Sequence, residues 1–253
     1  YYGELLVWAL QRYLEKEQWQ IDKTIGYHER APIYLDIHTD YATSENLMVD
    51  GQLLLRRGEE RLIATVDTAT PFRKLIMVEG LARHENQANA FIEGVLEFAK
   101  EQNFYRGKKI EFTSRIRFLD VQEKTWESVI LDASIKEEIK ANTVGFLQQS
   151  EKWKRFGIPL KRGILLSGEP GTGKTIICKS LMTEGDSITC ISTSGYDLAE
   201  DDYITQLYEM AQDLSPCIVF IEDIDLIAQN RMEFGFMRGP ALLSLLAVMD
   251  GVE

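Results

Sequence analysis

The sequence is short of cysteine and of long apolar runs, and both shortages narrow the protein class. The three cysteines, Cys178, Cys190 and Cys217, follow no zinc-binding spacing, and each lies in an apolar segment. We therefore expect buried free thiols and a reducing compartment inside the cell, the cytoplasm. Apolar runs such as Cys217–Ile221 are far shorter than the roughly 20 residues of a membrane-spanning helix, so we expect no membrane contact.

Positive charge is also scarce. Lys and Arg number 28 against 40 Asp and Glu, which gives a net charge of −12. A broad nucleic-acid-binding surface needs the opposite balance, so nucleic acid is a disfavoured partner. The three histidines, His28, His38 and His84, stand in unrelated contexts and indicate no catalytic or metal site. The Asn-Lys-x-Asp segment by which GTPases read their base is missing as well, which argues against a GTPase.

Residues 1–106 predict a small α+β domain. Apolar stripes at helical spacing predict two amphipathic helices, one within 1–20 and one over 88–99. Between them apolar and polar residues alternate, which is typical of strands, and Asp50-Gly51 and Arg57-Gly58 predict hairpin turns. We expect a mostly antiparallel sheet flanked by the two helices, with the helix stripes in its core.

Residues 107–125 predict a connecting strand and linker. Basic side chains from Arg106 to Arg117 alternate here with apolar ones such as Ile110 and Phe112. This pattern fits a strand with one solvated basic face. It also fits a contact for an acidic partner or for a nucleotide on a neighbouring subunit.

The strongest chemical pattern lies at 163–175. The apolar run Ile164–Leu166 predicts a buried strand, and the next residues fit G-x-x-x-x-G-K-[ST] in every position. Glycines let successive backbone N–H groups point at phosphate oxygens, and the following helix adds the positive end of its dipole. Nucleotide-binding residues are expected to be Gly168, Glu169, Pro170, Gly171, Thr172, Gly173, Lys174, Thr175 and Ile176.

Two of these residues have further expected roles. Lys174 can reach the β- and γ-phosphates of a nucleoside triphosphate, and the Thr175 hydroxyl can ligate Mg²⁺. Downstream, the apolar run Ile218–Ile221 leads directly into Glu222 and Asp223. The interval from Lys174 to Glu222 holds a helix, a strand, a helix and a strand, which predicts a parallel sheet with acidic groups at its carboxyl edge. The pattern therefore predicts a nucleoside triphosphate and Mg²⁺ as cofactors; the resemblance described next implies that the nucleotide is ATP.

These features, with flanking segments, give residues 126–253 a resemblance to the first half of an AAA-type ATPase module. The flanking landmarks are Trp126-Glu-Ser-Val-Ile, Phe156-Gly-Ile-Pro-Leu-Lys-Arg-Gly, Ser215-Pro-Cys-Ile-Val-Phe-Ile-Glu-Asp and Leu242-Leu-Ser-Leu-Leu-Ala-Val-Met-Asp-Gly. The resemblance implies an α/β fold with a P-loop parallel sheet in the order 5-1-4-3-2. It implies a homo-oligomeric ring, a hexamer, with ATP between subunits and adenine near Ile130 and Leu131. Sensor, arginine-finger and lid residues are expected beyond 253.

The two carboxylates stand in an order, Glu then Asp, that resembles the Bcs-type branch of the family. By that resemblance Glu222 is the residue on the Mg²⁺ side, and Asp223 is the base that polarises water; both are catalytic together with Lys174. Asp is one methylene shorter than Glu, so hydrolysis can be slow. The loop around Tyr196 departs from that of ring unfoldases: Tyr196 is either a substituted pore residue or a turn side chain. Phe234 and Phe236 suit either a second pore loop or a subunit contact.

The leading hypothesis is an ATP hydrolase that remodels or translocates a protein client, in the manner of a chaperone. The N-terminal domain would recruit the client or an adaptor. A second hypothesis is a nucleotide-gated scaffold or switch with little turnover. A nucleic-acid motor or loader is a third, and the net charge of −12 counts against it.

Overall fold

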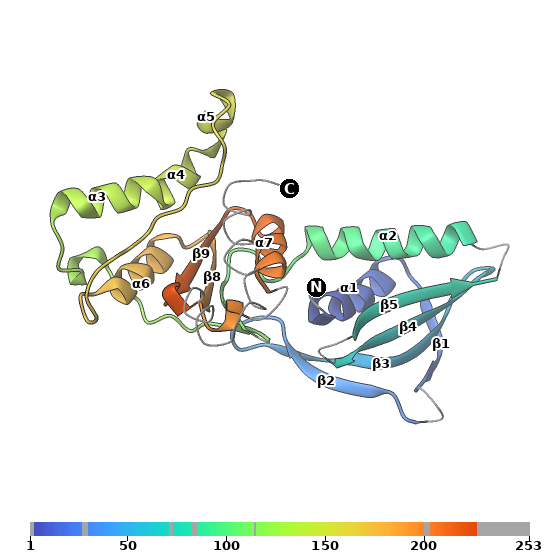
Figure 1. The fold of residues 1–253 in the computed structure, drawn as a ribbon. Coiled ribbons are helices and arrows are strands. Elements are labelled where there is room, and N and C mark those ends of the chain that lie inside the picture. The colour runs from blue at the N-terminus through green and yellow to red at the C-terminus, as the bar shows by residue number, and fades with distance from the viewer. Residues whose placement is uncertain are drawn as a thin grey trace, which may run out of the picture. The chain divides into compact units, whose positions relative to one another are not determined.

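The computed structural model describes residues 3–26, 30–70, 73–81, 85–113, 115–199 and 203–226. The chain divides into two compact units, Tyr1–Phe104 and Tyr105–Glu253 (Figure 1). Predictions made for His28, His84, Phe234, Phe236 and the landmark after Leu242 fall outside the described residues. Within those residues, no helix is both long and apolar enough to cross a bilayer.

The first unit is built on one antiparallel sheet. Its strands are β1 (Gln20–Ile25), β2 (Ile33–His38), β3 (Ser44–Arg57), β4 (Glu60–Thr70) and β5 (Arg73–Gly80). Their order is β1-β3-β4-β5, and β2 also pairs with β3. All four pairings are antiparallel, as the alternating sequence pattern predicts.

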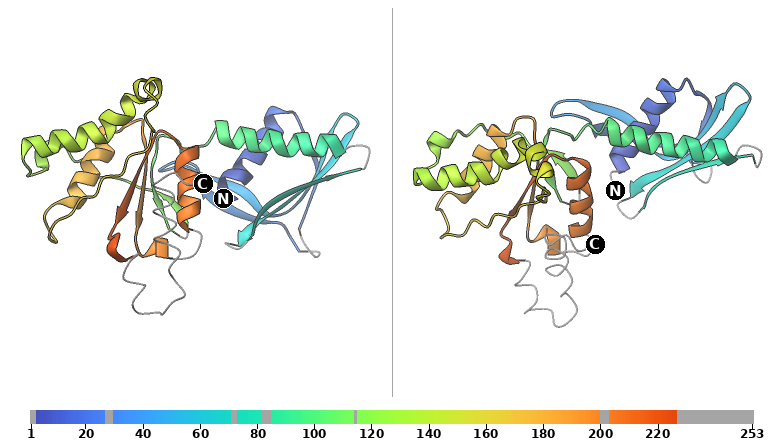
Figure 2. Two further views of the ribbon diagram at one scale, coloured as in Figure 1. Left: turned by 45° about the horizontal axis from the view of Figure 1, so that its top comes forward. Right: turned by 90° about the horizontal axis from the view of Figure 1, so that it is seen from above.

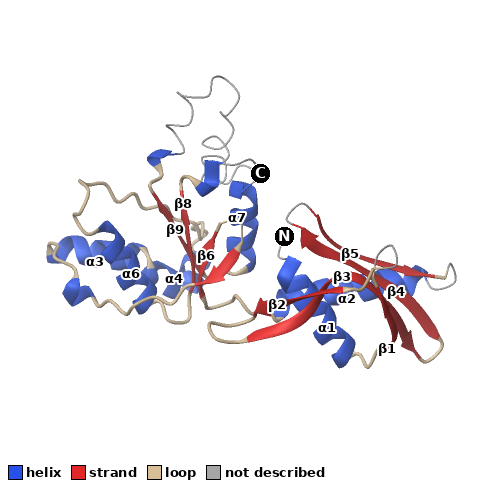
Figure 3. Cartoon of the chain, turned by 90° about the horizontal axis from the view of Figure 1, so that it is seen from below, coloured by secondary structure: helices blue, strands red, loops and turns tan. Residues whose placement is uncertain are grey.

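Two helices cover one face of this sheet, α1 (Gly3–Lys16) and α2 (Glu85–Glu101), and they pack on each other (Figure 3). The predicted stripes are buried at most of their positions, with Leu10 of α1 and Phe91 of α2 each 3% exposed. Leu96, an apolar residue of the stripe expected over 88–99, is 51% exposed. The helical period therefore locates the core face of α2 and overestimates its width.

The turn predicted at Asp50-Gly51 is wrong. β3 runs straight through it, and on one edge the strand changes partner there, from β2 at Asp50 to β1 at Gln52. A Cβ on Gly51 would lie 2.9 Å from the Ile25 carbonyl oxygen, so this glycine permits a close backbone approach rather than a turn. The second predicted turn is confirmed, since Gly58 has φ +59° between the paired ends of β3 and β4.

The second unit contains a four-stranded sheet in the order β7-β6-β8-β9. The strands are β6 (Lys109–Phe112), β7 (Ile116–Phe118), β8 (Thr189–Ser194) and β9 (Cys217–Glu222). β6, β8 and β9 are parallel, and β7 is antiparallel to β6. The helices are α3 (Ala133–Asn142), α4 (Val144–Gln148), α5 (Ser150–Arg155), α6 (Lys174–Glu184) and α7 (Tyr203–Asp213), with short 3₁₀ turns η3 (Trp126–Ser128) and η4 (Asp197–Ala199).

α6 and α7 lie on opposite faces of this sheet (Figure 2). On the α6 side, Ile177 and Leu181 pack with Cys190 of β8 and Phe220 of β9 in one apolar cluster. On the α7 side, Ile204, Leu207 and Met210 are buried. The parallel pair β8–β9 has apolar cover on both faces, which agrees with the α/β class predicted from the sequence.

The buried strand predicted at Ile164–Leu166 is not formed. These residues have no strand assignment, and Leu165 is 75% exposed. The order 5-1-4-3-2 uses the family's own strand numbers, which differ from the labels β1 to β9. In that order Ile164–Leu166 is strand 1 and pairs with the family's strands 4 and 5. Neither of those two strands is present in the described part of the chain. Leu166 nevertheless packs against the apolar cluster beside α6. The neighbouring pair 2–3 corresponds to β8 and β9, and the complete order remains a prediction.

Residues 107–125 do more than connect domains. β6 pairs in parallel with β8, from Lys109 opposite Cys190 to Glu111 opposite Ser192. The expectation of a solvated basic face fails at Lys109, whose ammonium donates to the carbonyl oxygens of Gly185 at 2.7 Å and of Asp186 and Ile188 at 3.1 Å. Arg106 likewise donates to the carbonyls of Asp213 and Ser215. These basic side chains therefore bind the strand to the second unit.

Candidate functional site

The loop before α6 takes the conformation that its glycines permit. Gly171 has φ +78° and Gly173 has φ +93°, in the left-handed region that glycine enters without a Cβ clash. Gly173 is the N-cap of α6, and its carbonyl accepts from the N–H groups of Ile176 at 3.0 Å and Ile177 at 3.1 Å. The chain thus turns directly into the helix. The unpaired N–H groups and the positive dipole end of α6 form an anion-binding terminus.

Internal hydrogen bonds close this loop. The Lys174 ammonium donates to the carbonyl oxygens of Gly168 at 2.6 Å and Glu169 at 3.0 Å. The Thr172 hydroxyl donates to Glu169 at 2.8 Å. The positive charge of Lys174 is therefore held inside the ring of the loop by neutral acceptors. Phosphate oxygens are stronger acceptors because they carry charge, so they can exchange with those carbonyls.

A cavity of about 580 Å³ opens between α6 and the carboxyl ends of the parallel strands. Thr175, at the start of α6, and Glu222, at the end of β9, both line it. The sequence predicted these two residues as Mg²⁺ ligands, and the fold brings them to one cavity from different elements. Their hydroxyl and carboxylate oxygens are hard donors of the kind that Mg²⁺ prefers.

This donor set suits a metal shared with a ligand. Among the residues that the structure describes, no cluster of three or more His, Cys, Asp and Glu side chains could hold a metal ion alone. Mg²⁺ is usually bound by one or two protein oxygens together with phosphate oxygens and water. Thr175 and Glu222 fit that pattern.

The cavity also contains a cysteine that the sequence placed only in the core. Burial raises the pKa of Cys178 to about 11, and the charge of Glu222 contributes in the same direction. Burial likewise raises the pKa of Cys190 to about 11, and it raises the pKa of Cys217 further. All three are free thiols, as predicted, and they stay protonated at neutral pH. A nucleophilic role for Cys178 is therefore disfavoured.

Asp223 lies in a tight turn directly after β9. It has φ +48°, an unusual value for a residue with a side chain. The Gly195 N–H donates to the Glu222 carbonyl at 2.8 Å, and the Leu226 N–H donates to the Asp223 carbonyl at 3.0 Å. A Cβ on Gly195 would lie 2.3 Å from the Asp223 oxygen. The loop after β8 therefore fixes the backbone that carries the predicted base.

The structure does not bring the predicted adenine contacts to the cavity. Ile130 is 97% exposed, and Leu131 packs partly buried against the apolar cluster. Ile176 is exposed on α6. The nearby landmark Trp126 has a structural contact: its indole N–H donates to Glu184 at 2.7 Å, at the last turn of α6. The adenine roles of Ile130 and Leu131 stay predictions, and so does the nucleotide contact expected of Ile176.

Sequence reasoning missed several polar residues of the cavity. Lys179 lies one helical turn after Thr175, and Glu111 lies on β6. Ser194 and Asp197 also line it, and the Ser194 hydroxyl donates to the Asp197 carboxylate at 2.5 Å. The Lys179 spacing and the Ser-x-x-Asp turn were visible in the sequence. Glu111 had no signal, because only the β6–β8 pairing places it there.

Comparison with known proteins shows which family part of the second unit resembles. Residues 164–253 match the model of the ATPase family associated with various cellular activities (AAA). The matched segment includes the phosphate loop, Thr175, Glu222 and Asp223.

Curated relatives agree with this match. An ATP-dependent zinc metalloprotease FtsH from Acidobacterium capsulatum is 34% identical over 152 residues, 55% of this chain and 24% of the relative. The FtsH protein of Acidothermus cellulolyticus is 36% identical over 130 residues, 47% of this chain and 19% of the relative. The FtsH protein of Clostridium perfringens is 31% identical over 175 residues, which is 64% of this chain and 24% of the relative.

The chain thus spans about a quarter or less of the length of these relatives. The likeness to the Bcs-type branch stays a prediction. The phosphate loop, the paired carboxylates and the family match coincide in the second unit. Residues 164–253 of this unit therefore resemble the AAA family of ATPases.

Proposed function

We propose that the protein binds Mg²⁺–ATP at the start of α6 and hydrolyses it to remodel or translocate a protein client. The observation that carries this proposal is the meeting of Thr175 and Glu222 at one cavity, next to a loop in which Gly171 and Gly173 have positive φ. The N-terminus of α6 and its Lys174 then lie next to a cavity that a hydroxyl and a carboxylate line. That combination suits a triphosphate with its metal.

Each residue has a specific task in this proposal. Lys174 moves from the carbonyls of Gly168 and Glu169 to the β- and γ-phosphates, while the N–H groups of the loop hold the remaining oxygens. Thr175 and Glu222 hold the Mg²⁺, which when bound neutralises charge on the phosphate oxygens. Asp223 accepts a proton from, or orients, the attacking water.

The names of the relatives support a protein as the client class. They are named as ATP-dependent metalloproteases, so their ATP use is coupled to work on proteins. The remodelling role applies that coupling to this chain. The first unit, residues 1–104, would recruit the client or an adaptor. The AAA domains would assemble as a homo-oligomeric ring, a hexamer, with ATP between neighbours.

A nucleotide-gated scaffold with little turnover is the second candidate, and one observation favours it. Asp223 is a shorter base than Glu, and its backbone is in the left-handed region at φ +48°. A protein whose catalytic base is held in a constrained turn and is one methylene shorter than Glu can bind ATP and hydrolyse it slowly. Such a protein would respond to nucleotide without acting as a motor.

The test is the steady-state ATP hydrolysis of the full-length protein, measured alone, with a chemically unfolded protein and with duplex DNA. The proposal expects hydrolysis that the unfolded protein stimulates and DNA leaves unchanged. Stimulation by DNA alone would establish a nucleic-acid motor. Tight ATP binding with no turnover in any condition would establish the scaffold.

A further inference from the structure

The sheet of the first unit has an edge strand, β2, that is open to a further strand. β2 pairs along one side with β3, and among the described residues no strand pairs with its other side, the outer edge of β2 (Figure 1). An edge of this kind presents a row of backbone N–H and C=O groups. Because the row has the spacing of a strand, the group that satisfies it best is an extended peptide backbone.

Apolar side chains lie at this edge on both faces of the sheet. Ile33, Tyr34 and Leu35 are 47%, 47% and 49% exposed, whereas Ile37 of the same strand is only 4% exposed. Successive strand residues point to opposite faces, so Tyr34 and Leu35 offer an apolar neighbour on each face. Leu35 is paired with Leu47 of β3, which is 1% exposed. The apolar core of the unit therefore continues to the edge and is exposed there.

The other two edge strands carry the charges by which natural sheets discourage pairing at an edge. β1 and β5 together contain Asp22, Lys23, Arg73, Lys74 and Glu79. β2 contains a single Asp, Glu, Lys or Arg residue, which is Asp36. Its carboxylate accepts from the Asn46 amide of β3 at 2.8 Å. β2 is therefore the edge that its sequence protects least.

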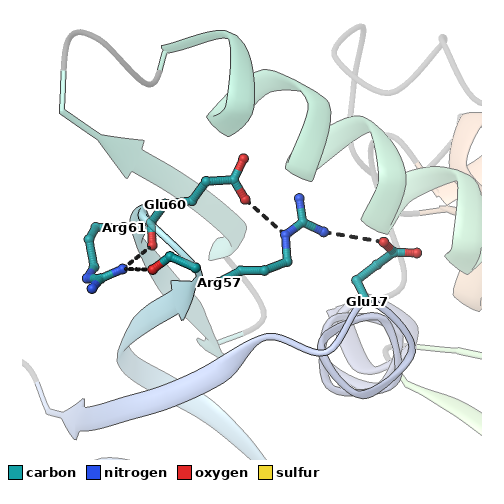
Figure 4. A network of polar contacts seen from close by, with 5 residues as sticks. Glu17, Arg57, Glu60 and Arg61 are labelled. Carbon is teal, nitrogen blue, oxygen red and sulfur yellow. Dashed lines mark hydrogen bonds and ion pairs between the residues drawn. The ribbon is translucent and has the colours of Figure 1, made fainter.

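A charged network marks the β3–β4 hairpin instead (Figure 4). Arg57 donates from Nε to Glu60 at 2.9 Å and from Nη1 to Glu17 at 3.3 Å. Arg61 donates to the backbone carbonyls of Gly58 at 2.7 Å and Glu60 at 2.8 Å. These charged groups bond one another at one end of the sheet. The outer edge of β2 is the surface that suits a partner with apolar side chains.

Charge favours a peptide over a second copy of this chain as that partner. Asp36 is exposed near the middle of β2, and the whole chain has a net charge of −12. A second copy would bring another Asp36 and another negative molecule to the contact, whereas a peptide with Lys or Arg brings the opposite sign. Asp36 lies on the same face as Tyr34, and Leu35 lies on the other. A strand that alternates basic and apolar residues matches both faces.

We propose that the outer edge of β2 binds an extended peptide segment with alternating apolar and basic side chains, which joins the sheet as a further strand. Backbone groups pair with β2, the apolar side chains pack beside Leu35, and the basic ones lie beside Asp36. This inference rests on the proposed function, because it specifies how the first unit would recruit an unfolded protein client. Peptide binding at this edge requires no ATP hydrolysis.

The test measures binding of a fluorescein-labelled peptide of alternating Val and Lys, as long as β2, to the full chain without nucleotide. Fluorescence anisotropy reports the binding. A second peptide has the same side chains and methyl groups on its backbone nitrogens, and a third has Glu in place of Lys. We expect saturable binding of the first peptide. The N-methylated peptide should bind at least about tenfold more weakly, the size expected for one or two lost hydrogen bonds, and the Glu peptide should also bind more weakly.

A matched pair of variants locates the contact. Leu35→Lys places a charge on the edge and removes an apolar contact, so it should weaken binding of the Val–Lys peptide at least about tenfold. Leu81→Lys changes an equally exposed leucine just beyond the end of β5, at 52% exposure, and should leave binding unchanged. Asp36→Asn keeps the side-chain size and should weaken binding about twofold to fivefold, as the loss of an exposed ion pair does. It tests the edge independently if Leu35→Lys does not fold.

Equal affinity for the N-methylated peptide would overturn the proposal, and so would full binding by both Leu35→Lys and Asp36→Asn. Analytical ultracentrifugation of the same proteins tests the other occupant. A peptide that does not bind, together with a smaller oligomer for Leu35→Lys than for Leu81→Lys, would assign the edge to a second copy and overturn the proposal. Peptide binding at the edge with ATP hydrolysis that unfolded protein does not stimulate would support this inference and overturn the proposed function alone.

Discussion

Replacement of Gly195 by alanine tests whether the Asp223 backbone positions the catalytic base. Gly195 follows β8, and its N–H donates to the carbonyl of Glu222 at 2.8 Å. Its φ is not in the positive region, so alanine meets no conformational penalty of its own there. The added Cβ would lie 2.3 Å from the Asp223 oxygen and 3.1 Å from the Asp223 carbonyl carbon. Any effect of the substitution therefore comes from contact with the turn after β9.

The size of the effect follows from those distances. Ordinary Cβ contacts begin at 3.4 Å. The added Cβ and the Asp223 carbonyl oxygen, which would lie 2.3 Å apart, must therefore separate by about 1 Å. Both partners are backbone, and no side-chain rotation can absorb the shift. A misplacement of about 1 Å at a reacting group costs about a hundredfold in rate. We expect Gly195→Ala to lower kcat by about a hundredfold, or about 2.7 kcal/mol.

Nucleotide affinity should change little, because the glycine loop, Lys174 and Thr175 belong to another segment. The assay measures steady-state ATP turnover and fluorescent-nucleotide binding on the same full-length protein. Gly58→Ala is the control: its Cβ meets nothing within 4 Å, but φ +59° makes it destabilising by about 1–2 kcal/mol. It should lower stability and leave turnover unchanged. Full turnover in Gly195→Ala would refute the positioning role of this contact.

Three further predictions concern stability. Thiols in the unfolded chain have a pKa of ~8.5, whereas burial raises the pKa of Cys178 and Cys190 to about 11 in the folded state. Their contribution to the free energy of unfolding is therefore complete below pH ~8.5 and is lost as the pH rises toward 11. Urea unfolding should give a lower free energy of unfolding at pH 10 than at pH 7. In Gly94→Ala the new Cβ would lie 2.2 Å from the Tyr13 hydroxyl, so thermal unfolding should report a loss of about 1–3 kcal/mol in the first unit. Lys109→Met removes the donor for three carbonyls and should destabilise the second unit, with hydrogen exchange fastest at β6; unchanged protection there would contradict the anchoring role.

The site was predicted from the sequence where the chemistry depends on residues close together in the chain. The phosphate loop needs Gly171, Gly173, Lys174 and Thr175 in one short segment, and the positive φ values of both glycines agree with the motif. Glu222 was found because an apolar run ends at it. Residues of the same cavity that arrive from other elements, such as Glu111, carry no local pattern.

The errors in the predicted fold have a common physical cause: residues distant in the sequence decide the local structure. Asp50-Gly51 has the composition of a turn, yet β3 continues because Ile25 approaches it closely. Ile164–Leu166 has the composition of a buried strand, yet no described strand pairs with it. Lys109 was expected on a solvated face of a strand, yet three carbonyls accept hydrogen bonds from its ammonium. In each case the presence or absence of partners distant in the sequence overrides local preference.

The most direct test of the account is Asp223→Asn in the full-length protein, with ATP binding and ATP turnover measured together. The substitution keeps the size of the side chain and removes its capacity to accept a proton. We expect unchanged ATP affinity and a turnover lowered by at least about a hundredfold. Asp225→Asn, two residues along the same segment, is the matched control and should keep most of the turnover. Full turnover in Asp223→Asn would contradict the assignment of Asp223 as the base.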